Sequence, residues 1–159
     1  MLHVPSGQLG DRNLAPVGIH CILELYGCPS HLLNDGPFIQ QALRDAARQA
    51  RSTLVAEVLH QFEPQGVTAL ALLAESHISI HTWPEAGYAA VDVFTCGEQA
   101  DPERACHYLT GSLQAAQHDL CKLPRKTGDR EPEVPTNWRV GKVHQHSLKA
   151  SPTDDHLRG

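Results

Sequence analysis

The sequence predicts an α+β fold, a two-layer sandwich in which a mostly antiparallel sheet carries its helices on one face. Two observations lead to this prediction. Patterns typical of strands and helices follow one another in the order β-α-β-β-β-β-α, and the links between the middle strands have the length of hairpin turns. The length of 159 residues suits one domain with a single core.

The first strand and the first helix are predicted in the N-terminal third of the chain. Residues 18–26 alternate as in a half-buried strand. Residues 34–37 (Asn-Asp-Gly-Pro) are typical of a helix start, because proline suits the first helical position and Asx side chains cap free amides. Apolar residues then recur at helical spacing to about Ala50.

Four further strands and a second helix are predicted behind this helix. The expected strands are 54–62, 67–74, 76–82 and 88–95. The segment 67–74 is short and almost wholly apolar, as in a central strand. Asp101 and Pro102 are typical of a helix start, and this helix is predicted to bury a stripe that runs from Ala105 to Ala116.

The two ends of the chain differ from its body. Residues 1–17 contain glycine, proline and serine, and we expect them to be mobile. Residues 122–159 carry eight basic and five acidic residues without apolar periodicity, which predicts a basic, disordered tail. The domain is therefore predicted over 18–121. Residues 1–121 carry five basic and thirteen acidic residues, so we do not expect nucleic-acid binding.

Membrane association is not expected either. Apolar runs stay shorter than the roughly 18 residues that cross a bilayer, and the N-terminal residues resemble no secretory signal. The five cysteines form no CxxC pair, which is typical of reduced thiols in a cytoplasm. We therefore expect a cytoplasmic protein.

The residues from 75 to 85 are the unusual part of the sequence. Side chains alternate along a strand, so two isoleucines take one face while His77 and His81 share the other. Two histidines on the polar face of a hydrophobic sheet are not what a core requires. If this strand pairs with the following one, we expect Ser76, His81 and Cys96 to converge on one pocket.

Other interpretations of these residues are less favoured. A zinc site at His77 and His81 would need Cys96 or Asp92 as further ligands. Four residues along a strand rise about 13 Å, too far for two ligands of one ion, so we expect no metal. A serine hydrolase would need a Gly-x-Ser-x-Gly turn around Ser76, which the sequence lacks. An isolated histidine is most often a surface or core residue, and an isolated cysteine a buried inert thiol.

Two segments carry a resemblance to a known family. They are residues 76–85 (Ser-His-Ile-Ser-Ile-His-Thr-Trp-Pro-Glu) and 87–97 (Gly-Tyr-Ala-Ala-Val-Asp-Val-Phe-Thr-Cys-Gly). Together they resemble the signature of prokaryotic S-adenosylmethionine decarboxylase proenzymes, in particular the small class that uses a pyruvoyl group and no added metal. The resemblance extends from about residue 18 to residue 116.

This resemblance implies that the chain cuts itself between Glu75 and Ser76. The Ser76 hydroxyl would attack the Glu75 carbonyl, and elimination would leave a β chain, residues 1–75, and an α chain that begins with a pyruvoyl group made from Ser76. His81 matches the family's base for the α-proton of that serine. The pyruvoyl group would form a Schiff base with S-adenosylmethionine and decarboxylate it, a step of spermidine and polyamine biosynthesis. Cys96 matches the proton donor of that reaction.

The same resemblance implies how the substrate is held. Phe62 would stack on the adenine from a second subunit, in a homodimer of αβ units, and Glu85 would hold the ribose hydroxyls. Trp83 would line the pocket and attract the sulfonium through a cation–π contact. The alternative for Phe62 and Trp83 is plain core packing. Thr68 stands where relatives often carry serine, and it keeps the hydroxyl.

Two other functions remain open at this point. Arginine or ornithine decarboxylases share the fold and the pyruvoyl chemistry, but Phe62 and Glu85 favour a nucleoside substrate. An unprocessed paralogue could act as a regulatory partner, but the presence of Ser76, His81 and Cys96 argues against it.

Overall fold

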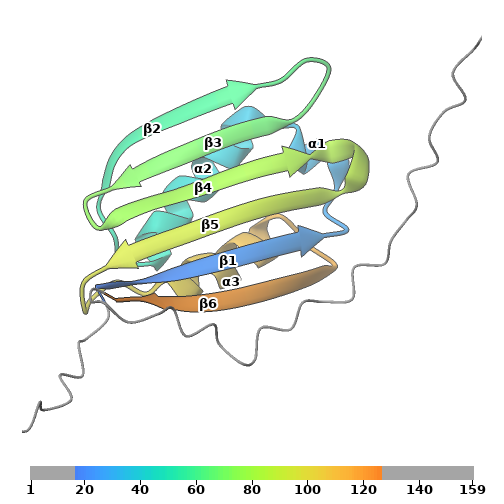
Figure 1. Cartoon of the computed structure of the whole chain (residues 1–159). Coiled ribbons are helices and arrows are strands. Elements are labelled where there is room, and N and C mark those ends of the chain that lie inside the picture. The colour runs from blue at the N-terminus through green and yellow to red at the C-terminus, as the bar shows by residue number, and fades with distance from the viewer. Residues whose placement is uncertain (1–16, 127–159) are drawn as a thin grey trace, which may run out of the picture.

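The frame of the structure is a six-stranded antiparallel sheet with two longer helices on one of its faces (Figure 1). The structure is a computed structural model, and it describes residues 17–126. The strands are β1 (Gly18–Tyr26), β2 (Leu54–Gln61), β3 (Val67–Leu73), β4 (Ser76–Trp83), β5 (Tyr88–Cys96) and β6 (Gln117–Arg125). The helices are α1 (Ser30–Leu33), α2 (Gly36–Gln49), the short 3-10 helix η1 (Pro84–Ala86) and α3 (Pro102–Ser112). The strand order is β2-β3-β4-β5-β1-β6.

The hydrophobic core lies between the sheet and the helices α2 and α3. Alternate residues of the central strands point into it, as period-two patterning requires, and the apolar stripes of both helices cover them. The largest completely buried side chains include Leu23, Leu25, Ile39, Leu43, Ile78, Ile80, Val91, Val93 and Leu109. The predicted two-layer α+β sandwich is confirmed.

Both helix starts follow the predicted local chemistry. A side-chain oxygen of Asp35 accepts a hydrogen bond from the backbone N–H of Phe38, at 2.9 Å, and Asp101 accepts one from Arg104, at 3.2 Å. In each helix proline occupies an early position, where its missing N–H costs nothing. These aspartates therefore satisfy amides that the helix itself leaves free.

The end of α3 departs from the prediction. The helix stops at Ser112, and Gln114 takes a left-handed conformation with a φ of 52°. Ala116, predicted in the buried helical stripe, therefore lies beyond the helix, where its N–H donates to the carbonyl of Tyr26 at 2.9 Å.

Strand β6 is absent from the predicted elements and crosses the domain boundary predicted after residue 121. Its charges and Pro124 are typical of a tail. They are compatible with a strand because β6 is an edge of the sheet, paired with β1, where polar side chains and proline are tolerated. The domain thus extends at least to Arg125. The predicted mobile segment 1–17, apart from Val17, and the predicted tail beyond Lys126 lie outside the described residues.

Candidate active site

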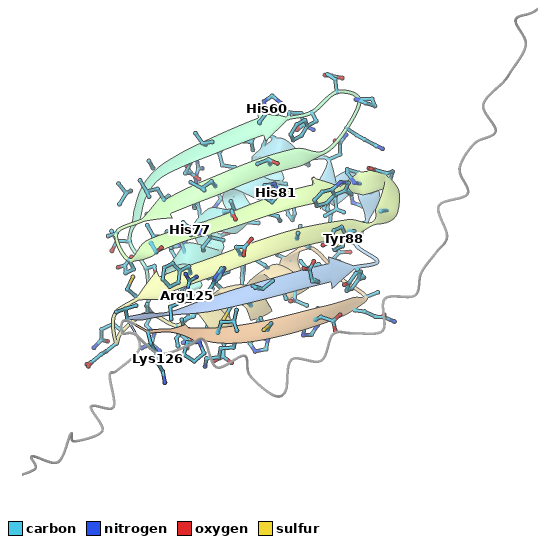
Figure 2. All side chains as sticks on the ribbon, in the orientation of Figure 1. His60, His77, His81, Tyr88, Arg125 and Lys126 are labelled. Atoms are coloured by element: carbon cyan, nitrogen blue, oxygen red, sulfur yellow. The ribbon has the colours of Figure 1, made fainter. Side chains whose placement is uncertain are left out.

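The face of the sheet turned away from α2 and α3 carries the candidate site residues. Side chains of His77, His81 and Tyr88 lie on this face, and Figure 2 shows the two histidines toward opposite ends of β4. Apolar side chains are also displayed there, since Val58 of β2 is 66% exposed and Leu72 of β3 is 44% exposed. We call this surface the open face.

One end of the open face holds the tight turn that precedes Ser76. Residues 74–75 link β3 to β4, and the pair of Leu73 with Ser76 closes the hairpin. The Glu75 carboxylate accepts a hydrogen bond from the N–H of Thr53 at 2.9 Å, which ties the turn to the chain before β2. Ser76 has a φ of 156°, a value that residues with a side chain rarely adopt. The peptide bond between Glu75 and Ser76 therefore sits in a constrained turn.

Cys96 provides two hydrogen-bond donors to the Glu75 carbonyl oxygen. Its backbone N–H lies 3.0 Å from that oxygen and its Sγ lies 2.9 Å from it. The contact arises because β4 and β5 pair antiparallel, with Ser76 opposite Thr95. Two donors on one carbonyl oxygen would stabilise the negative charge that develops there when a nucleophile attacks the carbonyl carbon.

The Ser76 hydroxyl is the nucleophile nearest in sequence to that carbonyl, and its partner is a histidine. Ser76 Oγ lies 3.2 Å from Nδ1 of His77. Adjacent residues of a regular strand point to opposite faces, so this contact depends on the unusual backbone at Ser76. The family resemblance assigns no role to His77, and the sequence predicts it as a residue on the polar face of this strand.

A cavity of about 440 Å³ lies at the other end of the open face. It is lined by Phe62, Glu63, Gln65, Gly66, Thr68, His81, Thr82, Trp83 and Glu85. All three predicted substrate-binding residues are in this set. Phe62 and Trp83 are 46% and 42% exposed, so neither belongs to the core. The cavity combines two aromatic side chains with two carboxylates, which suits a flat, cationic ligand.

His81 belongs to this cavity and is positioned by Thr68. The two residues are opposite each other in the β3–β4 pairing, and Nδ1 of His81 lies 2.8 Å from the Thr68 hydroxyl. A hydroxyl on one ring nitrogen fixes the orientation of the imidazole and leaves Nε2 free to exchange a proton.

The predicted convergence of Ser76, His81 and Cys96 is therefore wrong within a single chain. Ser76 and Cys96 meet, but His81 is five residues further along an extended strand, a rise of about 16 Å. Strand pairing brings side chains together across the ladder and not along it. The chain thus has two separate groups: the cleavage corner (Glu75, Ser76, His77 and Cys96) and the His81 pocket.

The family of the chain follows from comparison with known proteins. The model of the family described as S-adenosylmethionine decarboxylase matches residues 19–126. The chain belongs to this family. The match includes β6, and so it continues beyond the residue 116 at which the predicted resemblance ended.

Comparison with individual proteins leads to the same family. The S-adenosylmethionine decarboxylase proenzyme of Synechococcus sp. (strain WH7803) is 58% identical over 111 residues, which are 70% of this chain and 87% of that protein. The proenzyme of Methanococcus maripaludis is 58% identical over 109 residues, 69% of this chain and 89% of that protein. The crystal structure of the adenosylmethionine decarboxylase from Aquifex aeolicus VF5 has a TM-score of 0.68 at 36% identity, over 74% of this chain and 98% of that chain.

A group of polar residues that the sequence does not predict to come together borders the cleavage corner. Nε2 of His20 lies 2.9 Å from an Asp92 oxygen, and Nδ1 of His20 lies 3.3 Å from Nη1 of Arg125. The Arg125 guanidinium sits over the Phe94 ring, 5.5 Å from its centroid. Alternation on β1 could have placed His20 on the open face. Arg125 belongs to the segment that the sequence predicts as a tail, so its place beside His20 depends on the pairing of β6 with β1.

An aromatic row borders the other group, the His81 pocket. The Tyr88 ring lies 5.2 Å from that of Trp83 and 5.5 Å from that of Tyr26, between centroids. Burial, together with a hydrogen bond to Glu24, raises the pKa of Tyr88. The phenol therefore stays neutral at physiological pH, and Tyr88 packs against Trp83 as an uncharged aromatic side chain.

Residues 17–126 show neither a metal-type cluster nor a membrane-length helix. Within this range no three His, Cys, Asp or Glu side chains gather as a metal site would require. None of the helices in the same range is long and apolar enough to cross a membrane.

Proposed function

We propose that the chain is a self-processing S-adenosylmethionine decarboxylase, which cuts itself between Glu75 and Ser76 and converts S-adenosylmethionine to its decarboxylated form and CO₂. The observation that carries the proposal is the pair of Cys96 donors on the Glu75 carbonyl, directly before the serine of the family signature. Family membership supports the same activity, since the relatives named above are decarboxylases or their proenzymes.

Self-cleavage begins with attack of Ser76 Oγ on the Glu75 carbonyl carbon. A planar peptide bond resists this reaction because of its resonance. The constrained turn and the two Cys96 donors lower that resistance, since they act on the bond and on the charge that forms. The amide becomes an ester, and removal of the Ser76 α-proton then expels the Glu75 carboxylate. Water completes the process by releasing ammonia, which leaves a pyruvoyl group at position 76.

The residues around position 76 fit a pyruvoyl group at that position. When formed, a pyruvoyl ketone supplies an electrophile for the substrate amine and takes up the electrons released with CO₂. Cys96 lies beside this position, and its thiol can donate a proton to the substrate α-carbon after CO₂ leaves. Phe62, Trp83 and Glu85 would hold the adenosyl part of the substrate in the His81 pocket.

The proposal includes a homodimer, because the site is incomplete in one chain. A base must come within hydrogen-bond reach of the proton that it removes, and His81 is about 16 Å along β4 from Ser76. A second copy that packs on the open face with twofold symmetry would bring its His81 pocket over the cleavage corner, and the reverse contact would complete a second site. The exposed Val58 and Leu72 supply apolar surface for this packing.

A mixing experiment tests this arrangement. Chains carrying Ser76→Ala and chains carrying His81→Ala are each expected to remain uncut when produced alone. When the two are co-expressed with different tags, the His81→Ala chain should be cut, because the Ser76→Ala chain supplies its histidine. The control replaces the Ser76→Ala chain by a Ser76→Ala, His81→Ala double variant, which should rescue nothing. Absence of cleavage in the first mixture, despite mixed dimers, would rule out a shared site.

Substrate choice is tested by CO₂ release from carboxyl-labelled S-adenosylmethionine, arginine and ornithine. We expect release from S-adenosylmethionine alone. The reason is that Phe62 and Trp83 of the His81 pocket offer stacking surface for an adenine, and Glu85 offers a carboxylate for ribose hydroxyls, two groups that arginine and ornithine lack. Release from arginine or ornithine instead would refute the substrate assignment while leaving the self-cleavage intact.

A further inference from the structure

We propose that His77 is the base that takes the proton of the Ser76 hydroxyl in the first step of self-cleavage. This inference rests on the proposed function, since it assigns a residue to that same reaction. Its basis is the distance of 3.2 Å between Ser76 Oγ and His77 Nδ1, within a hydrogen bond of the nucleophile. With its proton on Nε2, the imidazole presents Nδ1 as an acceptor.

Two other candidate bases, Glu75 and His81, are engaged elsewhere. The Glu75 carboxylate accepts a hydrogen bond from the N–H of Thr53, which directs it toward the chain before β2. His81 hydrogen-bonds to Thr68 in its own pocket. His77 is the side chain that, within residues 17–126, forms a hydrogen bond with the Ser76 hydroxyl. Because the contact joins neighbours in sequence, it needs no second subunit.

The ring of His77 is held by the strand next to it. His77 is opposite Phe94 in the β4–β5 pairing, and the two rings meet nearly edge to face, with centroids 6.2 Å apart and planes at 70°. Phe94 is itself flanked by His20, 5.7 Å away between centroids, and by the Arg125 guanidinium. The base is thus fixed by packing, as proton transfer in a defined direction requires.

Formation of the ester needs no reactant beyond Ser76, His77 and the Glu75 carbonyl. Nδ1 of His77 accepts the proton of Ser76 Oγ while Oγ forms a bond to the Glu75 carbonyl carbon. The negative charge passes to the carbonyl oxygen, where the Cys96 donors hold it. When the C–N bond breaks, its electron pair stays on the Ser76 nitrogen, and the proton moves from His77 to that nitrogen. The products are an ester and a free amine, and His77 is regenerated.

This assignment separates the two proton transfers of self-cleavage. His77 would serve ester formation, and His81 of the second subunit would serve the later removal of the α-proton. Loss of each histidine should therefore stop the reaction at a different stage. Loss of His81 should leave an ester in the chain, whereas loss of His77 should leave the original amide.

The test uses full-length precursors carrying His77→Ala, His77→Asn or His81→Ala, and treats each with neutral hydroxylamine, which cleaves esters and spares amides. We expect His81→Ala to be cut by hydroxylamine, and both His77 variants to resist it. Spontaneous cleavage of the His77 variants should be about 10²–10⁴-fold slower than that of the wild-type chain. Asparagine can still accept a hydrogen bond but cannot carry the proton, so a merely positioning role would be restored by His77→Asn. Free imidazole should restore cleavage of His77→Ala.

Two controls keep the result interpretable. Ser79→Ala changes the next residue on the same face of β4 and should be cut at the wild-type rate. Folding of the His77→Ala chain is shown if it rescues a co-expressed His81→Ala chain. Cleavage of His77→Asn at the wild-type rate, or a hydroxylamine-labile His77→Ala precursor, overturns the role of His77. An uncut wild-type chain would instead refute the proposed function itself.

Discussion

Replacing Ser76 with alanine is expected to abolish self-cleavage and decarboxylation together. Alanine removes the nucleophile that attacks the Glu75 carbonyl and the oxygen that becomes the ester. The two Cys96 donors remain, but they have no attacking group to assist. On a denaturing gel the variant should run as one chain of the full 17.4 kDa, and CO₂ release should fall to the background level.

The matched variant Ser76→Cys retains a nucleophile of similar size at the same position. It should be cut slowly, since a thiol can also attack the carbonyl. This contrast separates loss of the nucleophile from damage to the turn between β3 and β4. Cleavage of Ser76→Ala at residue 75 would show that a protease or another residue makes the cut.

Replacing Cys96 is expected to damage turnover more than processing. In Cys96→Ala the Glu75 carbonyl loses the thiol donor but keeps the backbone N–H, so processing should slow by about 10²-fold and still reach completion. After processing, no thiol is left beside position 76 to protonate the substrate α-carbon. Turnover per processed site should therefore fall by a further 10²–10⁴-fold, roughly the contribution of a positioned acid.

The variant Cys96→Ser distinguishes these two roles of the cysteine. Its hydroxyl can donate to the Glu75 carbonyl, so processing should return close to the wild-type rate, while decarboxylation stays low because an alcohol is a much weaker acid than a thiol. Processing is followed on gels and turnover by CO₂ release from processed protein. Equal losses of processing and turnover in both variants would mean that Cys96 does not act as a proton donor in decarboxylation.

Local sequence patterns predicted most of the fold. Asp35 and Asp101 marked the two helix starts because their chemistry is contained within one turn of the helix. The central strands were evident because their buried residues alternate. Strand β6 lacks such a pattern, since an edge strand can carry polar side chains on much of its surface. Its presence depends on pairing with β1, which no local pattern reports.

The candidate site was predicted in part, and the missing part is geometric. The meeting of Ser76 and Cys96 follows from the pairing of β4 with β5, two strands adjacent in sequence. The position of His81 could have been inferred from the same strand rise that excluded a zinc site, because five residues of a strand cannot fold back on Ser76. The contact of His77 with Ser76 depends on one unusual backbone angle, which the sequence does not disclose.

Mass spectrometry of the purified wild-type protein tests the self-cleavage most directly. We expect two chains, residues 1–75 with a free carboxylate and residues 76–159 with an N-terminal pyruvoyl group. Their summed mass should equal that of the intact chain plus one water and minus one ammonia. A single intact chain of 17.4 kDa, or a second chain that begins with unmodified Ser76, would contradict self-cleavage by Ser76.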